Sequence, residues 1–166
     1  EGGRLLNSVE IGHSTVFFQA WKLNVGRAVI YLLDTNLPEN EQHFQGLTST
    51  VYGGNIDTRI GQEIILGIGG VRLLRSMGIH PSVYHINEGH SAFLTLELFI
   101  QQLKTTGDRE KAEQQVRQMC IFTTHTPVPA GHDRFSHDIL HHTLNQFWSR
   151  SGLPFELVER KDRVPR

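Results

Sequence analysis

The sequence predicts an α/β fold in which a β-hairpin near the N-terminus precedes a parallel sheet with crossover helices. Three observations predict it. Two runs rich in β-branched and aromatic residues flank a short turn near the start of the chain. A long middle segment then carries apolar residues at helical spacing. Beyond residue 80, short apolar runs alternate with amphipathic segments, which is the order of strands and helices around a parallel sheet.

The hairpin is predicted from TVFFQAWKL at 15–23 and RAVIYLL at 27–33, which are separated by the tripeptide NVG. Asparagine and glycine between two such runs are typical of a tight turn. The second run ends at Asp34, whose carboxylate we expect to close the following turn, with access to a cleft as the alternative. The polar stretch LPENEQ then predicts a loop that leads to a short helix.

Residues 58–77 predict a long amphipathic helix, because their apolar side chains recur every three or four residues along one face. Gly78 marks its end. The GIGG stretch at 67–70 lies inside this helix, where small residues permit close packing against a neighbour. A phosphate-binding glycine loop would instead lie between a strand and a helix, so we expect no nucleotide there.

Strands and helices alternate in the second half of the chain. The apolar runs at 82–86 and 120–124 predict strands. Helices are predicted at 91–103, from an N-cap at Asp108 through Val116, and after an N-cap at Ser136. Ligands collect at the carboxyl ends of parallel strands, and both histidine-rich stretches of the sequence follow such ends.

Length and composition limit the classes of partner. The chain has 166 residues, a length that predicts one domain, or a piece of one, over 1–166. Lys and Arg number 16 and Asp and Glu number 17, so no strong net charge attracts nucleic acid or an anionic membrane. The single cysteine and the lack of a long apolar run lead us to expect a cytoplasmic protein without nucleic-acid or membrane partners.

The first candidate site is the stretch HINEGH at 85–90, between a predicted strand and a predicted helix. The Glu88 carboxylate and the His90 imidazole are two residues apart, so both can face one cleft, and Gly89 permits close backbone approach. The alternative is structural: Glu88 stabilises the positive end of the helix dipole, and His90 packs against its neighbours.

The second candidate site is THTPVPAGHD at 124–133. Pro127 and Pro129 restrict the backbone directly after the strand, so His125 is expected on a stiff loop. A neutral imidazole there can exchange hydrogen bonds with a hydroxyl group and can transfer a proton near neutral pH. The alternative is a structural loop whose histidines bond to carbonyl groups.

Four histidines and Glu88 in these two stretches raise the question of a zinc site. His85 and His90 are separated by a strand-to-helix break, and the HExxH pattern is absent. We therefore expect no metal site. Cys120 has no flanking charge that would activate its thiol, which predicts a buried structural side chain.

Four stretches of the sequence carry a family resemblance, and the last two are the most specific. They are YLLDTNLPEN at 31–40, VYGGNIDTRIGQEIILGIGGVRLLRSMGI at 51–79, HINEGHSAFLTLE at 85–97 and FTTHTPVPAGHDRF at 122–135. Together they resemble the α-glucan (glycogen/maltodextrin) phosphorylase family, and its shorter bacterial and archaeal branch most of all.

The resemblance implies two Rossmann-like domains that face a deep cleft, in a two-domain glycosyltransferase fold. This chain resembles only the middle and later part of the N-terminal domain. The implied activity is transfer of a glucosyl unit from the non-reducing end of an α-1,4-glucan to phosphate, which releases α-glucose 1-phosphate. The implied partners are the glucan and phosphate, and a homo-oligomeric complete protein is compatible with the resemblance.

The resemblance also suggests site residues. His125 matches the histidine that hydrogen-bonds the reacting sugar and brings its neighbouring backbone to the developing positive charge. Glu88 and His90 match an acid and a histidine of the catalytic pocket, and Asn87 precedes them as a further substrate-binding candidate. Many relatives have Asp-Thr-His where this chain has Glu-Gly-His. The gating loop of better-known members corresponds to residues 53–57 and is short here, so gating is not carried over.

Pyridoxal phosphate, which acts in this family through its own phosphate group, is the implied cofactor of the complete protein. The chain has four lysines, and none lies in a motif like the cofactor-binding lysine of the family: Lys22, Lys104, Lys111 and Lys161. We therefore expect the cofactor to bind outside this chain, and the chain alone to be inactive.

Three other functions compete with this interpretation. A carbohydrate-binding module would hold glucan without chemistry and would show shifts of the His90 and His125 rings on titration with maltoheptaose. A sugar-nucleotide glycosyltransferase would respond to a nucleotide sugar rather than to phosphate. A histidine-metal hydrolase would contain stoichiometric metal.

Overall fold

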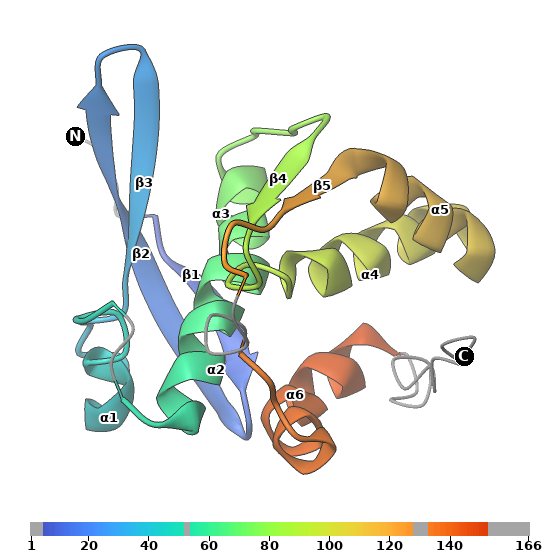
Figure 1. The fold of residues 1–166 in the computed structure, drawn as a ribbon. Helices are drawn as coiled ribbons and strands as arrows, with labels where there is room; N and C mark the ends of the chain where they lie inside the picture. The colour runs from blue at the N-terminus through green and yellow to red at the C-terminus, as the bar shows by residue number, and fades with distance from the viewer. Residues whose placement is uncertain (1–4, 52–53, 128–132, 153–166) are drawn as a thin grey trace.

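The computed structural model describes residues 5–51, 54–127 and 133–152. It has a three-stranded antiparallel sheet, a two-stranded parallel sheet and helices between and around them (Figure 1). The strands are β1 (Asn7–Ile11), β2 (Ser14–Val25), β3 (Ala28–Asp34), β4 (Tyr84–Asn87) and β5 (Cys120–Thr123). The helices are α1 (Gln42–Gln45), α2 (Ile56–Ile64), η1 (Ile65–Gly69), α3 (Gly70–Ser76), α4 (Leu94–Thr106), α5 (Arg109–Met119) and α6 (His137–Ser151).

The predicted hairpin is confirmed as β2 and β3, which pair antiparallel from Gln19↔Asp34 to Val25↔Ala28. Its two-residue turn is Gly26 and Arg27, whereas Asn24 and Val25 of the predicted NVG turn belong to β2. Gly26 has a φ of 59°, which glycine adopts without steric cost. The far half of the hairpin extends away from the rest of the molecule (Figure 1), and its apolar side chains, such as Trp21 and Leu32, are exposed there.

Strand β1 was not predicted from the sequence. It pairs antiparallel with β2, from Asn7↔Phe18 to Ile11↔Ser14. Together the two strands cover one side of the central helix.

The predicted long helix is confirmed as one continuous run of α2, η1 and α3, although its middle turn is a π-helix. One face packs against β1, β2 and α6 in the larger hydrophobic core, and another side packs against β4, α4 and α5 in a smaller core. The buried members of the larger core are Val9, Ile11, Val16, Phe18, Leu47, Ile60, Ile64, Ile65, Ile68, Leu73, Ile100, Leu144, Phe147 and Trp148. Burial of these apolar side chains holds the helix between the two sheets.

Glycines inside this helix permit close packing, as predicted. A Cβ atom at Gly67 would lie 2.7 Å from the Leu94 backbone nitrogen, and one at Gly69 would lie 3.1 Å from the Phe18 ring. The helix therefore approaches the start of α4 and strand β2 at distances that a side chain would prevent. Gly78 ends the run with a φ of 71°, as expected of a residue that terminates a helix.

The predicted parallel arrangement is confirmed for β4 and β5, which pair from Tyr84↔Cys120 to Asn87↔Thr123. Helices α4 and α5 connect them, and Asp108 caps α5 by accepting a hydrogen bond from the Lys111 backbone nitrogen. Strand β4 begins two residues later than predicted. The two strands end side by side, which brings both predicted site stretches to one edge of the sheet. Within the described residues, no helix is both long and apolar enough to cross a membrane.

Candidate functional site

Two stretches that lie far apart in the sequence meet at the carboxyl ends of β4 and β5. Asn87 and Thr123 are paired, and the Glu88 backbone nitrogen donates a hydrogen bond to the Thr123 carbonyl oxygen at 2.8 Å. His85 and Thr123 are also joined by a side-chain hydrogen bond of 2.7 Å between Nε2 and Oγ1. Because the two strands are parallel, the segments that follow them leave the sheet in the same direction at this edge.

Glu88 links the two stretches through its carboxylate. Oε1 accepts hydrogen bonds from the backbone nitrogens of His125 and Thr126, the second at 2.9 Å. The Thr126 hydroxyl donates to the same oxygen at 3.2 Å, and the Thr124 hydroxyl donates to Oε2 at 3.0 Å. Only 7% of Glu88 is exposed. Glu88 therefore fixes the backbone of the loop that carries His125.

These hydrogen bonds also set the charge of Glu88. The His125 backbone hydrogen bond, helped by those from Thr124 and Thr126, lowers the pKa of Glu88 from 4.5 to about 2 despite its burial. The residue is therefore a carboxylate at neutral pH. Glu88 also has a φ of 59°, and it is the non-glycine residue with a left-handed backbone in the described part of the chain. Such a conformation persists where the surrounding contacts hold it.

The side chains of His125 and Asn87 are exposed at this edge of the sheet. Their backbones are held by the sheet and by Glu88, so both side chains are available to a ligand on a fixed support. The carboxylate of Glu88, in contrast, is already occupied by hydrogen bonds from the protein. Its geometry is that of a residue that positions His125.

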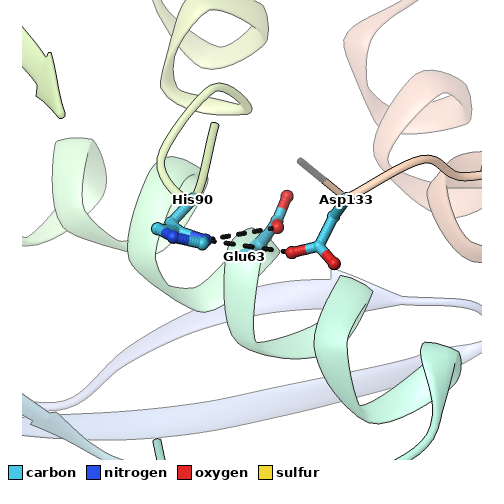
Figure 2. Close-up of side chains that lie close together, drawn as sticks. All are labelled: Glu63, His90 and Asp133. Atoms are coloured by element: carbon cyan, nitrogen blue, oxygen red, sulfur yellow. Dashed lines mark ion pairs between the residues drawn. The ribbon is translucent and has the colours of Figure 1, made fainter. Parts of the chain in front are cut away.

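His90 faces a different group of residues. Its Nδ1 atom lies 3.8 Å from Glu63 Oε1 on α2 and 3.8 Å from Asp133 Oδ2, which precedes α6 (Figure 2). Asp133 also forms an ion pair with Arg59, which is one helical turn before Glu63. The NEGH loop thus directs Glu88 toward the His125 loop and His90 toward this cluster of charged side chains.

The charges in this cluster are unequal. Burial, together with the neighbouring Asp133 carboxylate, raises the pKa of Glu63 to about 8. Burial alone would also raise the pKa of Asp133, but hydrogen bonds from Arg59 and Glu63, together with the Arg59 charge, lower it. At neutral pH, Asp133 is ionised and Glu63 retains a proton unless a cation replaces it.

A cavity of about 480 Å³ lies beside this cluster, between the hairpin and α2. Arg59, Glu63 and His90 line its polar side, and Tyr31, Leu33 and Leu66 are among its apolar walls. Sequence reasoning did not select Arg59 or Glu63, and it included Asp133 only as the last residue of the 124–133 stretch. A signal was present, because Glu63 lies within the apolar stripe of the predicted helix, three residues after Ile60, where a charged residue is unusual.

Other residues considered from the sequence have structural roles. Asp34 closes its turn by accepting from the Asn36 backbone at 2.9 Å, and it also accepts from the Trp21 ring nitrogen at 2.9 Å. Cys120 is partly buried at the start of β5, and burial raises the pKa of its thiol. His132 and residue 53 lie outside the described residues.

Maltodextrin phosphorylase of Thermococcus litoralis is 47% identical to this chain over 135 residues, which are 81% of this chain and 16% of that protein. This segment belongs to the α-glucan phosphorylase family. Glycogen phosphorylase of Mycobacterium tuberculosis is 40% identical over 151 residues, 87% of this chain and 18% of that protein. Glycogen phosphorylase of Aquifex aeolicus is 39% identical over 128 residues, 77% of this chain and 18% of that protein.

This phosphorylase segment therefore spans 16–18% of the length of the three relatives. No family model matches it. No solved structure matches it either.

Proposed function

We propose that this chain is part of the N-terminal, Rossmann-like domain of an α-glucan phosphorylase. The complete protein would be a glycosyltransferase that moves a glucosyl unit from the non-reducing end of an α-1,4-glucan to phosphate and releases α-glucose 1-phosphate. The observation that carries the proposal is the edge of the β4–β5 sheet, where Glu88 fixes the loop of His125. The identity to three phosphorylases over most of this chain supports the same assignment.

The proposed role of His125 is to hold the reacting sugar. A glucosyl group that leaves its glucan develops positive charge at the anomeric carbon, so the enzyme needs hydrogen-bond partners and dipoles that are already oriented. His125 meets this need because its backbone is fixed while its side chain is exposed. Asn87, whose side chain is exposed at the same sheet edge, is proposed to bind a sugar hydroxyl, and His90 is proposed to line the substrate pocket beside it.

Glu88 is proposed as a positioning residue in this reaction. Its carboxylate is saturated by donors from residues 124–126, so it acts on the sugar through His125. A displacement of His125 by about 1 Å is enough to reduce the rate about 10²-fold in a site of this kind. Relatives with aspartate at this position would reach the same loop with a side chain shorter by one methylene group.

The described residues do not fit pyridoxal phosphate, the cofactor of this family. Lys22 lies on β2, Lys104 in the last turn of α4, and Lys111 pairs with Asp108 at 3.7 Å on α5. None of these three lysines adjoins the sheet edge that carries Glu88 and His125. We therefore assign the cofactor and its chemistry to the complete protein.

The proposal is tested by substituting His125→Ala in the complete protein and measuring phosphorolysis of maltoheptaose. We expect kcat to fall by about 10²–10³-fold with a much smaller change in KM, because an oriented partner of the transition state is lost. His80→Ala is the matched control, because His80 is an exposed histidine on a loop away from the sheet edge. Equal activities of the two variants would contradict the proposed role of His125.

A second outcome concerns glucan binding without chemistry. If the complete protein binds maltoheptaose through His125 and releases no glucose 1-phosphate under any phosphate concentration, the chain belongs to a carbohydrate-binding protein. Ring shifts of His125 on titration with maltoheptaose, combined with no release of glucose 1-phosphate, would identify that case.

A further inference from the structure

Three potential metal ligands converge beside the sugar-binding edge, and they come from three different parts of the fold. Glu63 is on α2, His90 is on the loop after β4, and Asp133 precedes α6 (Figure 2). One ligand atom from each residue lies within 4.8 Å of the other two. Nothing in the proposed transfer of glucose requires these two carboxylates to face one imidazole.

Glu63 supplies an independent observation. Its side chain is only 9% exposed and points toward His90 and Asp133 (Figure 2). Its Oε1 atom is buried and has no hydrogen-bond partner among the described residues. A buried carboxyl oxygen without a hydrogen-bond partner costs free energy, and a ligand in the space that it faces would remove that cost.

We propose that Glu63, His90 and Asp133 bind a divalent transition-metal ion, with Zn²⁺ as the best fit. The nitrogen ligand favours zinc and its neighbours over Mg²⁺ and Ca²⁺, which prefer oxygen alone. A tetrahedral Zn²⁺ with bonds of about 2.0–2.2 Å separates its ligand atoms by about 3.3–3.6 Å. The two separations of 3.8 Å from His90 Nδ1 approach this geometry with small side-chain movements.

The surroundings are compatible with such an ion. Once the ion displaces the proton of Glu63, two carboxylates and the guanidinium of Arg59 leave one negative charge in the cluster when His90 is neutral. Arg59 also holds Asp133 in position, as hydrogen-bond partners of metal-binding carboxylates commonly do. Because Glu63 and His90 line the cavity of about 480 Å³, the remaining coordination position would open toward it.

The proposal is tested by titrating Zn²⁺ into the metal-free, full-length protein in competition with a chromogenic chelator. We expect one Zn²⁺ per chain and at least a ~10-fold loss of affinity in Glu63→Gln, since loss of a direct ligand exceeds loss of a supporting hydrogen bond. Glu41→Gln is the matched control, because Glu41 also lies 3.8 Å from a histidine Nδ1, that of His43, but is exposed. It should bind Zn²⁺ as the wild-type protein does.

The zinc X-ray absorption spectrum of the wild-type protein gives a second measurement. One imidazole with oxygen ligands is expected, and this readout remains valid if Glu63→Gln does not fold. Two or more imidazoles would place the ion on surface histidines such as His137 and His141, which stack on α6, and would overturn the proposal. Wild-type affinity in Glu63→Gln, or no stoichiometric Zn²⁺ in the wild-type protein, would also overturn it. These results do not depend on phosphorylase activity.

Discussion

At the scale of single residues, the site is organised by one carboxylate. Glu88 receives hydrogen bonds from two backbone nitrogens and two hydroxyl groups of residues 124–126. Hydrogen bonds of this kind favour the charged form of a carboxylate and are stronger than those between neutral groups. The charge of Glu88 and the position of His125 are therefore coupled.

We predict that this coupling depends on pH. The folded-state pKa of Glu88 is about 2, below its ordinary value of 4.5, so its hydrogen bonds stabilise the loop fully above about pH 4.5. The stabilisation is lost as the pH falls through 2. Hydrogen exchange of the His125 and Thr126 amides should therefore show higher protection factors in the wild type than in Glu88→Gln at pH 7, and this difference should shrink below pH 4.5.

The control for this prediction is Glu39→Gln, which removes an exposed carboxylate from the loop between β3 and α1. It should leave both protection factors unchanged at every pH. The prediction is wrong if the protection factors of the wild type exceed those of Glu88→Gln by the same ratio at pH 7 and at pH 3. In that case the charge on Glu88 does not hold the loop.

The sequence was sufficient to select the two stretches that meet at the sheet edge. The alternation of strands and helices predicts a parallel sheet, and both histidine-rich stretches follow its predicted strands, where ligands collect. It was not sufficient to separate the roles of Glu88 and His90. These residues are two positions apart, and the left-handed backbone of Glu88 helps direct them to different neighbours. Glu63 and Asp133 are separated by many residues, so their approach depends on how α2 and the segment before α6 pack.

At the scale of elements, the central helix sets the distances between the other parts of the fold. Its π-helical turn, η1, contains Gly67 and Gly69, and both glycines permit close contact with a neighbour. At Gly67 the neighbour is backbone at the start of α4, which cannot rotate away from a new side chain. This contact fixes α4, and with it the loop that follows β4, against the helix that carries Glu63.

We predict that Gly67→Ala lowers the free energy of unfolding by about 1–3 kcal/mol, because a Cβ atom would lie 2.7 Å from the Leu94 backbone nitrogen. Urea unfolding of the complete protein measures this change. Gly70→Ala is the matched control in the same helical run, since a Cβ atom there meets nothing within 4 Å. It should raise the free energy of unfolding by about 0.5–1 kcal/mol through helix propensity. Equal effects of the two substitutions would contradict the close contact at Gly67.

Most elements could be predicted from local patterns, and strand β1 shows where those patterns fail. Its sequence, NSVEI, has a glutamate between two apolar residues and reads as partly solvated. In the structure, Glu10 is 3% exposed because Arg72 and Arg150 pair with its carboxylate. Such burial depends on partners that are distant in the sequence, and periodicity does not contain that information.

At the scale of the whole molecule, the chain carries one edge of a proposed active site. The sheet edge offers His125 and Asn87 to a sugar, whereas the described lysines do not fit pyridoxal phosphate. The chain spans 16–18% of the length of its phosphorylase relatives. We therefore assign catalysis to the complete protein, and we expect the 166-residue chain alone to release no sugar phosphate.

The most direct measurement is the release of α-glucose 1-phosphate from maltodextrin in the presence of inorganic phosphate. The complete protein should release it in a phosphate-dependent reaction, and the 166-residue chain assayed in parallel should not. If the complete protein instead transfers glucose only from a nucleotide sugar, or the isolated chain releases glucose 1-phosphate by itself, the proposed division of the active site is wrong.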